Sequence, residues 1–139
     1  MAPDGDLEPI EPHVRDEVPP DDAHVVIRGG PVAAEKIVEH ALRQAREYSL
    51  AGAPMWSVSV SLTISGWSVD EILAGPMASR STIATSTVGV LRGSGYRLLA
   101  TYGAPHFDLV LPGASYDAAV RLLSHFTVGQ PNPYKRRRR

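Results

Sequence analysis

The sequence contains no cysteine, which excludes disulfides, thiolate zinc sites and a cysteine nucleophile. It also has no apolar run that approaches the roughly 20 residues needed for a transmembrane helix. Its first residues lack the basic and then apolar order of a secretory signal peptide. These absences predict a protein without a membrane-spanning segment, with the cytoplasm as its location.

Several motifs of enzyme sites are missing as well. The chain has no phosphate-binding loop, no Gly-x-Ser-x-Gly nucleophile elbow and no pair of histidines at the spacing of metal ligands. The five histidines lie far apart in the sequence: His13, His24, His40, His106 and His125. We therefore expect no metal ion and no resident cofactor.

The formal net charge of −1 hides a strong segregation of charge along the chain. Residues 1–22 are acidic and rich in proline, whereas residues 131–139 end in one lysine and four arginines. Such segments lack the apolar surface that offsets the entropy of ordering. We expect a disordered or extended acidic head, a single domain over residues 23–130 and a basic tail that either binds nucleic acid or only adds solubility.

The clearest predicted strand covers residues 56–65, where large apolar residues alternate with serine and threonine. This period of two places every large apolar side chain on one face and every hydroxyl on the other. The apolar face must pack on the first helix or its neighbours. The hydroxyl face could border solvent, pack under an element that needs small residues, or line a cleft.

The other elements follow from apolar spacing, helix caps and turn residues. Besides residues 56–65, the predicted strands are residues 24–28, 82–85, 96–102 and 106–111. The predicted helices are residues 31–49, 69–74, 88–92 and 116–126, of which the second begins at a Ser68–Glu71 capping box. This order predicts an α+β fold: one small domain whose sheet is mixed or largely antiparallel, with helices mainly on one face.

Residues 86–112 hold the densest pattern: a short helix, a glycine break and a hairpin with His106 just past its turn. Over residues 86–126 the chain resembles the HicA-type mRNA interferase toxins, which have a double-stranded-RNA-binding-like fold. The family's catalytic histidine falls on His106, and histidine has a pKa suited to activating a ribose hydroxyl. The resemblance implies RNA cleavage by His106, while Arg97 and the basic tail could bind phosphate.

A second pattern spans residues 24–112. Arg28 ends the first strand, Ser59-Val60-Ser61 lies on the next, and Asp108 precedes a Leu-Pro on a later strand. This order resembles ADP-ribosyltransferase-like folds, in which the acid is normally a glutamate. The resemblance implies NAD as the cofactor, bound through Arg28, a nicotinamide pocket shaped by Ser59 and Ser61, and Asp108 as the group that stabilises the developing cation.

Both resemblances lead to small bacterial toxins, so the sequence predicts a toxin-like effector of a toxin–antitoxin pair, with an antitoxin protein and RNA as expected partners. RNA cleavage is favoured over ADP-ribosyl transfer because His106 and the basic tail fit it directly, whereas the transferase resemblance has Asp108 in place of the usual glutamate. A non-catalytic protein-binding module that docks a partner strand stays open as a third class. His106 and Asp108 lie two residues apart on one predicted strand, so their side chains should share a face.

Overall fold

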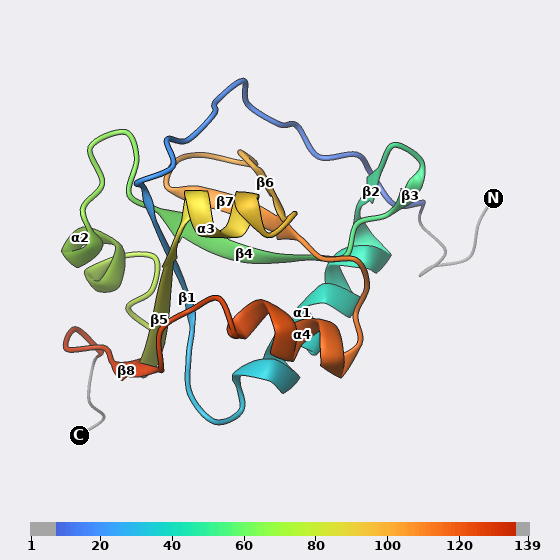
Figure 1. Cartoon of the computed structure of the whole chain (residues 1–139). Helices are drawn as coiled ribbons and strands as arrows, with labels where there is room; N and C mark the ends of the chain where they lie inside the picture. The colour runs from blue at the N-terminus through green and yellow to red at the C-terminus, as the bar shows by residue number, and fades with distance from the viewer. Residues whose placement is uncertain (1–7, 136–139) are drawn as a thin grey trace.

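A six-stranded antiparallel sheet with strand order β6-β7-β4-β1-β5-β8 forms the centre of the fold (Figure 1). Its strands are β1 (His24–Arg28), β4 (Ser57–Leu62), β5 (Thr82–Thr87), β6 (Arg97–Leu99), β7 (His106–Val110) and β8 (Gln130–Pro131). A separate two-stranded ribbon joins β2 (Ser49–Leu50) to β3 (Ala53–Pro54). This computed structural model describes residues 8–135.

Four helices complete the described part of the chain: α1 (Ala33–Glu47), α2 (Val69–Ala74), α3 (Val88–Gly93) and α4 (Tyr116–Leu123). The predicted α+β architecture is confirmed, and of the two sheet types that the sequence leaves open, mixed or largely antiparallel, the structure has the antiparallel one. The capping box that begins α2 is present, because Ser68 and Glu71 each bond the other's backbone N–H. None of the helices within residues 8–135 combines the length and the hydrophobicity that a transmembrane segment requires.

The neighbouring strands β1 and β4 separate soon after they meet. Within the described chain only two residue pairs join them, Val25 with Leu62 and Val26 with Ser61, although both strands continue past these pairs. By contrast, β1 pairs with β5 along its whole length, and β4 pairs with β7 at five positions. The sheet therefore opens into two arms, and Figure 1 shows β4 running across the direction of β1.

The main hydrophobic core lies on the sheet face that carries Val58, Val60 and Leu62 of β4. The apolar side chains of α1, α3 and α4 pack into it, as predicted for the apolar face of this strand. Figure 1 shows α1 and α4 side by side, and both belong to this core. A smaller cluster covers the opposite face, where Val26 packs under α2.

Residues 8–22 lie extended against the domain and are held there by specific contacts. Ile10 bridges Tyr48, and Val14 bridges Thr101. The composition of this acidic segment predicts a disordered or extended head, and it does not reveal these backbone pairings with distant residues. Of the basic tail, residues 131–135 are described, with Pro131 in β8. Arg136–Arg139 lie outside the described residues, as do residues 1–7 of the head.

Candidate functional site

A cleft of about 410 Å³ opens where β1 and β4 separate, and α1 forms one of its walls. Ser59 and Ser61 of β4 lie along its floor, with His106 of β7 beside them. His40 of α1 and Arg28 of β1 face the same space. Two side chains of the predicted hydroxyl face, Ser59 and Ser61, thus line a cleft, one of the three roles that the sequence leaves open. Ser57 on the same face is instead buried beside Gln44 and Asp108.

The pairing of β4 with β7 explains why these side chains gather. Ser59 pairs with Asp108, and Ser61 pairs with His106. Paired residues on antiparallel strands project to the same face of a sheet. His106 and Asp108 therefore share the face that carries the β4 hydroxyls, as their spacing predicts.

Asp108 lies beneath the cleft and is only 1% exposed. Its Oδ2 accepts a hydrogen bond from Thr101 Oγ1 at 2.6 Å. Its Oδ1 accepts from Gln44 Nε2 at 3.1 Å and from Ser57 Oγ at 3.4 Å. Burying a carboxylate is costly unless hydrogen bonds replace its water. Asp108 is therefore a buried acceptor that orders the side chains above it.

The hydrogen bonds of Thr101 define the tautomer of His106. Since the single hydroxyl proton of Thr101 goes to Asp108, its Oγ1 can only accept from His106 Nδ1, which lies at 3.1 Å. The carbonyl oxygen of Thr101, which is also an acceptor, lies 3.1 Å from the same nitrogen. Nδ1 therefore carries the proton of the neutral ring. Nε2 is left as an acceptor, and it lies 3.1 Å from Ser59 Oγ.

A second histidine approaches the same hydroxyl from α1. His40 Nε2 lies 3.4 Å from Ser59 Oγ, and it is the donor there because the Ser59 proton goes to His106. Burial, and after it the positive charge of Arg43, lower the pKa of His40 below the ordinary 6.5. Two imidazoles with opposite hydrogen-bonding roles thus converge on one oxygen atom.

Positive charge dominates the rim of the cleft. Its charged lining residues, apart from the histidines, are Arg28, Lys36, Glu39, Arg43 and Arg80. The single acid among them, Glu39, pairs with Lys36 at 3.3 Å on the exposed surface of α1. Guanidinium groups form charge-assisted, often bidentate bonds with phosphate. The rim therefore favours an anionic ligand. No group of three or more potential ligands within residues 8–135 is placed to hold a metal ion.

The structure brings together four of the residues selected from the sequence: Arg28, Ser59, Ser61 and His106 all line the cleft. Asp108 lies behind them, out of reach of a ligand in the cleft. Arg97 is exposed on the edge strand β6 and is not part of the cleft lining.

Sequence reasoning missed His40, Gln44 and Thr101. A usable signal existed for His40, since it lies between Ile37 and Ala41 at the border of the apolar stripe of α1. No local pattern marks Gln44 or Thr101, because each acquires its role only from Asp108, which is remote in sequence. Comparisons with protein-family models, curated proteins and solved structures find no match to this chain.

Proposed function

We propose that this protein cleaves RNA by acid–base catalysis, with His106 as the general base and His40 as the general acid. One observation carries the proposal: His106 Nε2 and His40 Nε2 lie 3.1 Å and 3.4 Å from the same hydroxyl oxygen, that of Ser59. One imidazole is an acceptor toward that oxygen and the other is a donor. Acid–base cleavage of RNA requires this combination of roles.

The proposed reaction begins when the ribose 2′-hydroxyl loses its proton to His106 Nε2. The 2′-oxygen attacks the adjacent phosphorus, so that the O2′–P bond forms and the P–O5′ bond breaks. His40 donates a proton to the departing 5′-oxygen. The products are a 2′,3′-cyclic phosphate and a 5′-hydroxyl, and Ser59 positions the ribose beside the base.

The cationic rim supports an anionic polymer as substrate. Arg28 and Arg80 lie on the β1 side of the cleft, and Arg43 lies on α1. Lys135, the first residue of the basic run, donates to the carbonyl oxygen of Ser79 at 2.9 Å, next to Arg80. The basic run thus starts near the cleft, which favours contact with the phosphates of a longer strand.

The proposed cellular role is that of a toxin in a toxin–antitoxin pair. The resemblance of residues 86–126 to HicA-type toxins assigns their catalytic histidine to His106, the residue that the cleft geometry also favours. The antitoxin would be a protein that covers the cleft. Messenger RNA as substrate places the activity in the cytoplasm.

The test uses purified full-length protein and an end-labelled single-stranded RNA. Wild type should release a 2′,3′-cyclic phosphate, and a 2′-deoxy substitution at the cleaved position should block the cut. His106→Ala and His40→Ala should each lower the rate on the order of 100-fold or more. His125→Ala is the control, since His125 packs edge-on against Tyr96 outside the cleft. Uncut RNA with wild type, or full activity in His106→Ala, would refute the proposal.

ADP-ribosyl transfer is the second candidate, because Arg28 and Ser59 face one cleft from separate strands. Asp108 does not reach the cleft, which leaves the developing cation without the acid that the resemblance assigns to it. The candidate predicts that labelled NAD transfers its label to a lysate component, and that Arg28→Ala lowers this transfer. If no lysate component acquires the label, ADP-ribosyl transfer is eliminated. A protein with neither activity that forms a stable complex on pull-down would be a binding module.

A further inference from the structure

We propose that Arg15, on the N-terminal segment, is a positioning residue for the general base: it holds the turn that orients the ring of His106. This inference rests on the proposed function for its kinetic consequence. Its structural consequence, the tautomer of His106, can be measured whether or not the protein cleaves RNA.

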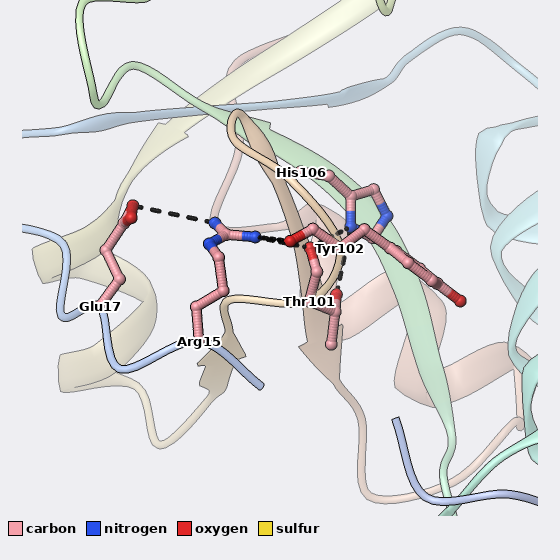
Figure 2. A network of polar contacts seen from close by, with 5 residues as sticks. All are labelled: Arg15, Glu17, Thr101, Tyr102 and His106. Carbon is pink, nitrogen blue, oxygen red and sulfur yellow. Dashed lines mark hydrogen bonds and ion pairs between the residues drawn. The ribbon is translucent and has the colours of Figure 1, made fainter. Parts of the chain in front are cut away.

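The N-terminal segment runs beside the connection from β6 to β7. The backbone N–H of Arg15 donates to the carbonyl oxygen of Ala100 at 2.8 Å, next to the bridge between Val14 and Thr101. The guanidinium then reaches into the turn, where Nη1 donates to the carbonyl oxygen of Thr101 at 3.0 Å and also to that of Tyr102. Figure 2 shows both carbonyls at the guanidinium and the ring of His106 beside the same turn.

This turn controls His106 through two residues. Thr101 accepts from Nδ1 with both its hydroxyl and its carbonyl oxygen, each at 3.1 Å. The Tyr102 ring packs edge-on against the imidazole, with 5.0 Å between centroids. Tyr102 has a φ of +59°, a left-handed conformation that non-glycine residues seldom adopt without support from their surroundings. The donation from Arg15 to the Tyr102 carbonyl oxygen supplies such support.

The Thr101 carbonyl oxygen connects Arg15 to His106. It accepts from Arg15 Nη1 and from His106 Nδ1, so one atom links the N-terminal segment to the base. If the carbonyl turned away, Nδ1 would lose one of its two acceptors. The ring could then carry its proton on Nε2 instead, and Nε2 could no longer accept a proton from the substrate.

Arg15 is built into the fold. Its side chain is 22% exposed, lies 5.6 Å from the centre of the Phe107 ring and pairs with Glu17 at 3.8 Å. Arg92 fastens the same segment elsewhere, through the Asp21 carboxylate at 2.7 Å and the Pro19 carbonyl oxygen at 2.9 Å. Loss of Arg92 would loosen the segment without touching the turn. A variant of Arg92 is therefore the control that tells loss of segment anchoring apart from loss of the contacts that orient His106.

The experiment compares wild type, Arg15→Gln, Arg15→Lys and Arg92→Gln as full-length proteins. Imidazole ¹⁵N chemical shifts, measured at pH 8, report the tautomer of His106. We expect the Nδ1–H form in wild type and Arg92→Gln, and a mixture in Arg15→Gln. Lysine can reach one carbonyl but lacks the fork of arginine, so Arg15→Lys should lie between them. An unchanged tautomer in Arg15→Gln overturns the inference.

RNA cleavage provides the second measurement. Arg15→Gln should lower kcat on the order of 10-fold to 100-fold and leave KM nearly unchanged, because the substrate does not touch Arg15. Should Arg15→Gln not fold, Arg15→Lys decides the question, since a pure Nδ1–H tautomer in that variant overturns the inference. If wild type cleaves no RNA, the ribonuclease proposal fails. The tautomer comparison then still supports or overturns the role of Arg15.

Discussion

Ser59 Oγ lies 3.1 Å from His106 Nε2, although the two residues are diagonal neighbours on their strands rather than a directly paired couple. The direct partner of Ser59 is Asp108, and that of His106 is Ser61. Diagonal neighbours on a sheet face stay within reach of long side chains. The His106 ring thus leans along the sheet toward Ser59, and its acceptor nitrogen points at the serine hydroxyl.

Ser59→Ala should reduce RNA cleavage without abolishing it, because Ser59 is proposed to position the ribose. We expect kcat/KM to fall about tenfold, which corresponds to about 1.4 kcal/mol of transition-state stabilisation. Steady-state kinetics on a short RNA provide the measurement, with Ser65→Ala, beyond the end of β4, as the control. A drop of several thousandfold would instead identify Ser59 as a covalent nucleophile.

Asp108→Asn should destabilise the fold by roughly 2–4 kcal/mol, because an amide cannot accept from Thr101, Gln44 and Ser57 as a carboxylate does. Denaturant unfolding followed by circular dichroism measures the change. Asp117→Asn, in the first turn of α4, is the control and should cost less than about 1 kcal/mol. Equal midpoints for the two variants would contradict the assigned role of Asp108.

The rate of RNA cleavage should fall as the proposed general acid His40 loses its proton. This falling limb of the pH–rate profile should lie below pH 6.5, because burial and Arg43 lower the pKa of His40. Arg43→Gln removes a neighbouring positive charge, so this limb should move to higher pH. The control is Arg46→Gln, an exposed residue of α1 outside the cleft lining. An NMR titration of His40 that shows a pKa above 6.5 would contradict the prediction.

His40 also links stability to pH. Its pKa is lower in the folded state than the 6.5 of an unperturbed imidazole, so between the two values the unfolded chain binds more protons. The free energy of unfolding should therefore fall as the pH drops from about 6.5 through the folded-state pKa. In His40→Gln this part of the pH dependence should vanish, which denaturant melts at several pH values can measure. An identical pH dependence in both proteins would rule out the contribution of His40.

Arg28→Gln should weaken RNA binding and flatten its dependence on salt, because Arg28 is proposed to contact a phosphate. Loss of one phosphate contact with a single strand should reduce the slope of log K against log salt by roughly 0.7. Fluorescence anisotropy at several salt concentrations measures the slope. An unaltered slope would place the phosphates elsewhere on the rim.

Local patterns predict much of this fold. The alternation along residues 56–65 predicts both faces of β4, and the Ser68–Glu71 spacing predicts the start of α2. Both features depend on residues close together in the chain. The two-residue strands β2, β3 and β8 were not predicted, because such short segments pair only where the fold brings a partner to them.

The site was less predictable, since its connections are remote in sequence. His106 and Ser59 could be selected from motifs, but the burial of Asp108 depends on Gln44 and Ser57 from two other elements. In the sequence, Arg15 stands out only as the single lysine or arginine among the acids of residues 1–22. Its side chain binds the backbone carbonyl oxygens of Thr101 and Tyr102, and no side-chain pattern in a sequence indicates where a carbonyl oxygen will lie.

One buried residue of β1, Val26, lies where the cleft between β1 and β4 begins, and a substitution there can change the shape of the cleft. Two residue pairs join the arms of the sheet, and Val26 belongs to one of them and is fully buried under α2. Val26 belongs to the same apolar cluster as Met77, which lines the cleft. A bulkier side chain at Val26 would press on α2 and on the loop after it, which carries Arg80 of the rim. A substitution in the core could therefore alter the distance between the proposed phosphate contacts and the proposed base, without changing any residue that lines the cleft.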